Sequence, residues 1–315
     1  MRTPTFVIGG ERRSGSSTVA KWIQAHPEIY LHPRMDAGFF LDDEIRGARI
    51  WNDGFVDSSK WSQSHSREDY LECFKGVGKQ VVAAGEKSAD YLFVSKTHAR
   101  ISEMFPEMKF IAILRDPIAR AWSHYWNEVG KNRETLGFDE AIEAEPDRCS
   151  RSEYALTHLS YVQRGMYDKS LRQLYKVFSP PQVYVLILEE LIADPKEELR
   201  KLYRFLGVNE DDGYQAAGRH VNQNWTTIPR AFWQTSPLTS YPEKLYNFVV
   251  KKSCKLLFRD VYRRRKIQVF LERLTRNSMS DFKLSDKQVL NLRRQFENSK
   301  NELSEMLERP LDCWS

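Results

Sequence analysis

The sequence predicts a three-layer α/β/α protein with a central, mainly parallel sheet. Two continuous apolar runs, Lys109–Leu114 and Val183–Leu188, have the length and composition of strands that are buried on both faces. A shorter run, Thr5–Ile8, passes through a glycine-rich turn into residues with helical spacing. Strands without alternation, separated by helical stretches, are typical of a parallel sheet that is covered on both sides.

In the first part of the chain, the sequence predicts short helices and a short strand. Apolar residues repeat at helical spacing over 19–25, and Pro27 ends this helix. Residues 29–31 form a second short strand by composition. Tyr70, Leu71 and Phe74 fit a short helix.

The second part predicts longer helices. Residues 118–129 and 196–206 have helical apolar patterns, and the second of these helices ends at Gly207. Residues 241–277 and 285–308 also have helical patterns.

The domain organisation follows from length and composition. The chain has 315 residues, of which 41% are apolar and 29% charged, which excludes disordered, fibrous and membrane-bundle proteins. No linker marks a boundary, so we expect a single domain over residues 1–315 with a helical C-terminal part from about 240 to 315. The net charge of +5 is too small to indicate nucleic acid as a partner but suits an anionic small ligand.

The cysteines and the N-terminus bear on the compartment. The four cysteines lie far apart with no C-x-x-C pair, which argues against a disulfide scaffold and a thiolate zinc site. No apolar run approaches the ~20 residues needed to span a bilayer, and no signal-peptide pattern is present. We therefore expect a cytoplasmic enzyme.

The turn after the first strand has the composition of a phosphate-binding loop. Gly10 and Gly15 and the hydroxyl of Ser17 fit the pattern G-x-x-x-x-G-K-S/T, but Ser16 occupies the lysine position. A turn between a strand and a helix directs N–H groups toward an anion. The cations stand earlier in the turn, which favours a terminal 5′-phosphate with a different leaving bond over ATP. The candidate ligand-binding residues are Arg12, Arg13, Ser14, Gly15, Ser16, Ser17 and Thr18.

With a second motif, the sequence resembles the sulfotransferases that use 3′-phosphoadenosine 5′-phosphosulfate (PAPS). Their phosphosulfate loop is similar to the segment 13–17, and their R-x-P-x-x-R-A-x-S-x-Y motif matches 115–125 at every fixed position. Arg115 ends a strand at the sheet's carboxyl edge, and Ser123 follows in the next helix, so both side chains suit one phosphate. The resemblance implies a P-loop nucleotide-kinase-like fold, PAPS as donor, adenosine 3′,5′-bisphosphate as product and no metal.

Further landmarks extend the resemblance to the glycosaminoglycan and bacterial branch of this family. Gly85–Leu92 is similar to the branch pattern G-E-K-S/T-P-x-Y-L. The segments Arg164–Tyr167, Leu188–Pro195 and Leu311–Trp314 resemble later landmarks. Their order along some 300 residues supports the family prediction more than any single motif does.

The catalytic residues are implied by the resemblance. The branch has a glutamate base in a K-E-x-x-F-F context, and Asp36 occupies this position with Phe39 and Phe40 after it. Arg13 matches the loop lysine that supports the bridging oxygen, and Lys87 matches a lysine near the sulfuryl group or the acceptor. His32 is the rival base, because the other large branch uses a histidine.

The acceptor is expected to be a small molecule or a carbohydrate. Aromatic residues in 51–74, among them Trp51, Phe55 and Trp61, suit the acceptor side. Arg219 is expected to contact phosphate from the loop that closes over the nucleotide, although the local match to the family is poor. Two other functions stay open at this stage, an ATP-dependent phosphotransferase and a non-catalytic nucleotide-binding relative.

Overall fold

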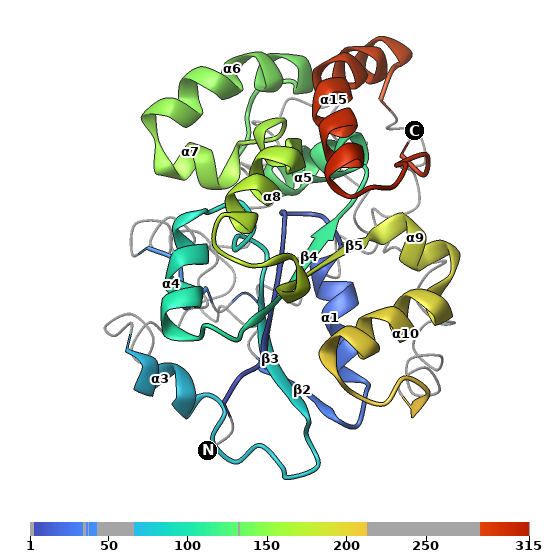
Figure 1. The fold of residues 1–315 in the computed structure, drawn as a ribbon. Coiled ribbons are helices and arrows are strands. Elements are labelled where there is room, and N and C mark those ends of the chain that lie inside the picture. The colour runs from blue at the N-terminus through green and yellow to red at the C-terminus, as the bar shows by residue number, and fades with distance from the viewer. Residues whose placement is uncertain are drawn as a thin grey trace, which may run out of the picture.

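The computed structural model describes residues 3–33, 36, 38–42, 66–131, 133–212 and 284–314. Within these ranges the strands form one parallel sheet (Figure 1). They are β1 (Phe6–Gly10), β2 (Ile29–Leu31), β3 (Ala83–Ser88), β4 (Lys109–Leu114) and β5 (Val183–Ile187). The predicted fold class is confirmed.

The order of the strands is β2-β3-β1-β4-β5, with β1 at the centre. The chain runs from β1 out to β2, returns to β3 beside β1, and crosses to β4 on the other side of β1. The order therefore reverses at β1. Ligands of open parallel sheets bind at such a switch point, outside the carboxyl ends of the strands.

Helices cover both faces of the sheet and its carboxyl edge (Figure 1). One face carries α1 (Ser16–Gln24), α9 (Leu188–Ala193) and α10 (Pro195–Leu206), and the other α3 (Arg67–Glu72), α4 (Lys96–Met104) and α8 (Tyr167–Tyr175). The remaining helices lie at the top of Figure 1, and they are α5 (Pro117–Gly130), α6 (Phe138–Arg151), α7 (Glu153–His158) and α15 (Asp286–Met306).

Alternate residues of the central strands build two cores. In β4, Phe110 packs on the side of α4 and α8, and Ile111 packs on the side of α1 and α10. Both side chains are fully buried. Because both faces are covered, strands of this kind show no polar alternation, which is the signal that the sequence displayed. A third apolar cluster joins α5, α6 and α15.

The predicted elements that lie in the described ranges agree with the structure, but β3 and the helices α4, α6, α7, α8 and α9 were not predicted. The strands at 109–114 and 183–188 are confirmed, and α15 confirms the helix predicted over 285–308. The strand β3 was not predicted, since Ala83–Ser88 contains no β-branched or aromatic residue. The helix predicted over 241–277 lies outside the described residues. Among the described helices, none combines the length and apolar character needed to cross a bilayer.

Candidate functional site

The turn between β1 and α1 lies at the centre of the sheet's carboxyl edge. Gly15 has a φ of +89°, and a Cβ there would come within 2.9 Å of Leu188, so the turn requires glycine. The N–H groups of Ser16 and Ser17, which begin α1, precede the first intrahelical hydrogen bond and suit an anion. Arg13 also has a positive φ of 73°, an uncommon conformation that tends to occur at turns and functional sites.

The hydroxyl residues of the turn divide into two groups. Ser17 and Thr18 are exposed, whereas Ser14 and Ser16 are buried. The Ser14 N–H donates to the Glu11 carbonyl oxygen at 3.0 Å, and its Oγ is buried without a hydrogen-bond partner among the described residues. Of these four side chains, those of Ser17 and Thr18 are the ones that solvent reaches.

Three predicted residues from distant parts of the chain meet beside this turn. Arg13 Nε donates to Ser123 Oγ at 3.2 Å, and Arg115 Nη1 donates to the Arg13 carbonyl oxygen at 3.1 Å. Arg115 follows β4, and Ser123 projects from α5, whose start is capped by the Asp116 carboxylate. The end of one strand and the next helix thus bring a guanidinium and a hydroxyl to the loop.

The electrostatics of this group favour an anion. Burial, together with the charge of Arg115, lowers the pKa of Arg13 to about 9. Burial also lowers the pKa of Arg115. Two desolvated guanidiniums next to each other are disfavoured, and a negative ligand between them relieves both effects. The residues therefore fit a phosphate.

A second group joins the predicted base, the predicted lysine and a loop hydroxyl. Lys87 Nζ, from the end of β3, donates to Asp36 Oδ1 at 2.8 Å and Oδ2 at 2.9 Å. It also donates to Ser17 Oγ at 2.8 Å. The Ala89 N–H donates to Asp36 Oδ1 at 2.9 Å. The carboxylate is thus fixed beside the start of α1.

Asp36 and Lys87 differ in their access to solvent. The Lys87 side chain is 1% exposed and the Asp36 side chain is 36% exposed. Asp36 has a φ of +58°, and its N–H donates to the Lys87 carbonyl oxygen at 2.9 Å. The lysine is therefore the buried member of the pair, and the carboxylate is the member that an external molecule can reach.

Arg12 points to a different set of groups from Arg13. Its Nε and Nη2 donate to the two Asp90 carboxylate oxygens at 3.0 and 3.2 Å, and its Nη1 lies 2.8 Å from His158 Nδ1. Arg164 Nη1 contacts Asp90 Oδ1 at 3.0 Å and Glu11 Oε2 at 3.1 Å. Asp90 and Arg164 thus form ion pairs with Arg12 and Glu11, two residues of the loop.

These contacts belong to a larger set, here called the buried ionic cluster. Its members are Glu11, Arg12, Asp90, Glu128, Arg133, His158 and Arg164. Burial alone would raise the pKa of Glu128, but His158, His124 and Arg12 hold it well below its ordinary value. Sequence reasoning missed Asp90 and Arg164 as supports of the loop, although both lie in segments that it singled out.

The other predicted residues are placed as follows. The His32 N–H donates to the Gly85 carbonyl oxygen at 2.8 Å, and its ring lies 6.2 Å from the Phe74 ring. Arg219 and the aromatic residues Trp51, Phe55 and Trp61 lie outside the described residues. Across the described ranges, no three His, Cys, Asp or Glu side chains are arranged to hold a metal ion.

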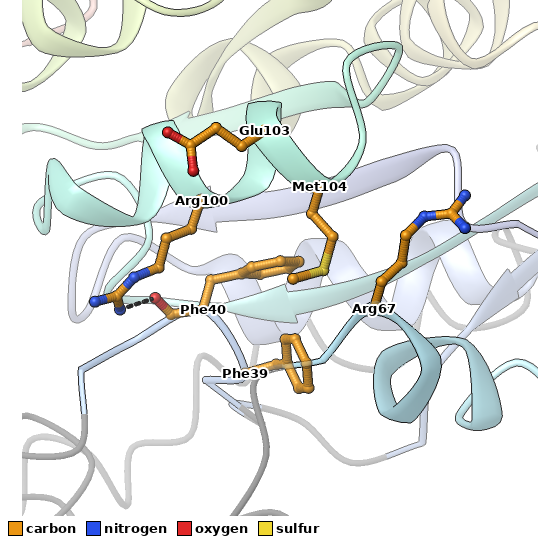
Figure 2. A pocket seen from close by; sticks show the side chains of 6 residues that line it. All are labelled: Phe39, Phe40, Arg67, Arg100, Glu103 and Met104. Carbon is orange, nitrogen blue, oxygen red and sulfur yellow. Dashed lines mark hydrogen bonds between the residues drawn. The ribbon is translucent and has the colours of Figure 1, made fainter.

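A hollow of about 410 Å³ opens next to the segment that follows Asp36 (Figure 2). Its lining comes from that segment, α3 and α4, and consists of Phe39, Phe40, Arg67, Arg100, Glu103 and Met104. Arg100 Nη1 donates to the Phe40 carbonyl oxygen at 3.0 Å, as Figure 2 shows. Among the described residues, the lining includes none from the loop and neither Asp36 nor Lys87.

The sequence and the fold are similar to those of known proteins. A sequence profile of the sulfotransferase family matches residues 4–212. Heparan sulfate glucosamine 3-O-sulfotransferase 3B1 of Mus musculus is 32% identical over 208 residues, which are 65% of this chain and 46% of the relative. Heparan sulfate glucosamine 3-O-sulfotransferase 5 of Homo sapiens is 26% identical over 65% of this chain and 54% of its own. The chain thus spans about half the length of these relatives.

A solved structure supports the fold. A sulfotransferase from Alicyclobacillus acidocaldarius superimposes with a TM-score of 0.67. The superposition covers 100% of this chain and 99% of the other, at 23% sequence identity. The two proteins therefore share the α/β fold described above.

Proposed function

Because the chain belongs to the sulfotransferase family, we propose that it transfers a sulfuryl group from PAPS to a hydroxyl or amine of a carbohydrate or small-molecule acceptor. The observation that carries the proposal is the meeting of Arg13, Arg115 and Ser123 beside the turn before α1. Two desolvated guanidiniums, a hydroxyl and a helix N-terminus suit a nucleotide that carries two separate phosphates.

Each group has a proposed role. Bound PAPS supplies the sulfuryl group. Arg13 remains charged and stabilises the departing phosphate by charge and hydrogen bonds, while Arg115 and Ser123 hold the 3′-phosphate. Asp36 accepts the proton of the acceptor, and Lys87 keeps the carboxylate in place. Arg12 acts through the buried ionic cluster by holding the loop.

The lysine position of the loop separates this reaction from ATP-dependent phosphoryl transfer. Ser16 occupies this position, and its side chain is 5% exposed. The usual cation for the β- and γ-phosphates is therefore missing there. We propose that donor binding needs no metal, that Arg219 contacts the nucleotide, and that the protein acts in the cytoplasm without nucleic acid as a partner.

The acceptor class is inferred from the relatives. The names of the two curated relatives above specify heparan sulfate glucosamine, which favours a carbohydrate acceptor here. Incubation with radiolabelled PAPS and a panel of oligosaccharides, phenols, amines and lipids tests the proposal. We expect labelled product from at least one acceptor, with carbohydrates first. A protein that binds the donor product but labels nothing would instead be a non-catalytic relative.

The Arg115→Ala variant should discriminate poorly between nucleotides. Its affinity for adenosine 3′,5′-bisphosphate should fall by about 10- to 150-fold, the worth of a hydrogen bond to a charged group of about 1.5–3 kcal/mol. Its affinity for adenosine 5′-phosphate should change little, because this nucleotide has no 3′-phosphate. Titration calorimetry of both nucleotides measures the difference. An equal loss for both would move Arg115 away from the 3′-phosphate.

A further inference from the structure

Both polar groups of the peptide unit between Arg115 and Asp116 form hydrogen bonds to side chains. Tyr167 OH donates to the Arg115 carbonyl oxygen at 2.8 Å. The Asp116 N–H donates to Glu189 Oε1 at 3.1 Å. The carbonyl and the N–H belong to one planar unit, so the two contacts fix its orientation. This orientation sets the direction in which Arg115 leaves the end of β4.

Trp314, near the C-terminus, contacts both Tyr167 and Glu189. Its Nε1 donates to Glu189 Oε2 at 3.0 Å. Its ring lies 5.7 Å from the Tyr167 ring. Trp314 is 3% exposed and Tyr167 is 1% exposed, so water does not compete for these contacts. The indole therefore contacts Tyr167 and Glu189 at the same time and restricts both side chains.

The segment that carries Trp314 is itself anchored. Lys300 Nζ, from α15, donates to the Trp314 carbonyl oxygen at 3.0 Å. Arg309 donates to Glu190 Oε2 at 2.9 Å and to the Val185 carbonyl oxygen at 3.0 Å. The side chain of Leu311 is buried in the core on the α4 and α8 side. These contacts tie the segment to β5 and α9.

The peptide also begins the helix that carries the other phosphate ligand. Asp116 Oδ1 accepts the Ile118 N–H at 2.9 Å and caps α5, which presents Ser123. A displaced Asp116 would therefore disturb both proposed 3′-phosphate ligands. Glu11 and Arg12 of the loop, by contrast, are held by the buried ionic cluster.

We propose that Trp314 is a positioning residue of the 3′-phosphate site, which acts through Tyr167 and Glu189 on the Arg115–Asp116 peptide. The C-terminal segment thereby sets the selectivity for nucleotides with a 3′-phosphate. This inference rests on the proposed function, because it uses the assignment of Arg115 to that phosphate.

The Trp314→Phe variant tests the inference, since it keeps an aromatic ring and removes the indole N–H. Titration calorimetry of the full chain should show an affinity for adenosine 3′,5′-bisphosphate that is lower by roughly three- to tenfold, the range for one hydrogen bond. The affinity for adenosine 5′-phosphate should stay within about twofold. Tyr167→Phe, which removes only the hydroxyl on the Arg115 carbonyl oxygen, should give the same pattern and serves if the first variant fails to fold.

Arg172→Gln is the matched control. It breaks the exposed 2.9 Å ion pair with Glu302 that joins α8 to α15, but it leaves the Arg115–Asp116 peptide untouched. It should bind both nucleotides as the wild type does. The inference is overturned if Trp314→Phe and Tyr167→Phe keep the wild-type ratio of the two affinities, or lose both affinities equally. A wild-type protein that binds both nucleotides alike would overturn the donor assignment itself, and this inference with it.

Discussion

The Asp36→Asn variant should lose turnover by about 10²–10⁴-fold, the usual contribution of a positioned base, while it still binds adenosine 3′,5′-bisphosphate. Asparagine keeps the shape and an oxygen for the Ala89 N–H, but it cannot accept the proton of the acceptor. The measurement is the initial rate with saturating PAPS and an acceptor from the radiolabelled panel. Donor-product binding by calorimetry on the same sample separates lost chemistry from a lost site.

The side effect of this substitution on Lys87 can be controlled. Lys87 is buried and would lose its anionic partner, so the melting temperature of the variant must be recorded beside its rate. His32→Asn is the paired variant and should retain most of its turnover. An inactive His32 variant beside a nearly normal Asp36 variant would transfer the role of base to the histidine.

The Asp90→Ala variant should be strongly destabilised. Asp90 is fully buried and contacts both Arg12 and Arg164, so its removal leaves two buried guanidiniums without this carboxylate. Breaking a buried ion pair on one side costs about 3–5 kcal/mol. Denaturant unfolding measures the change. Donor-product binding to the remaining folded protein should also weaken, because Arg12 belongs to the loop.

Asp147→Ala is the matched control for this loss. Asp147 pairs with Arg151, but the two side chains are 65% and 76% exposed. An exposed pair contributes about 0–1 kcal/mol, so this variant should unfold nearly as the wild type does. Similar free energies of unfolding for the two variants would mean that the buried ionic cluster does not stabilise the loop.

The strands that are easiest to predict from the sequence are those with a continuous apolar composition, because this composition indicates burial on both faces. β4 and β5 are continuous apolar runs, which only a doubly covered sheet explains. β3 reads Ala-Ala-Gly-Glu-Lys-Ser, and local propensity opposes a strand there. It forms because β1 and β2 pair with it on both sides, which is a tertiary effect.

In the site, too, local motifs predict single residues, but they do not predict contacts between distant positions. The motifs identified Arg13, Arg115 and Ser123 singly, but their contacts join positions that are 102 and 110 residues apart. Arg12 and Arg13 are adjacent in sequence, yet their side chains serve different groups. The Arg12 side chain is directed away from that of Arg13 because it binds Asp90. Asp90 is 78 residues away, so no sequence pattern near Arg12 predicts this contact.

Titration calorimetry of the wild-type protein with adenosine 3′,5′-bisphosphate, in EDTA and in Mg²⁺, tests the central claim most directly. The arginines, the hydroxyls and the N-terminus of α1 supply the binding groups, so the nucleotide should bind equally well with and without the metal. ATP with Mg²⁺ should bind more weakly, because Ser16 stands where a phosphotransferase has lysine. Binding that vanishes in EDTA, or a preference for ATP with Mg²⁺, would contradict the account.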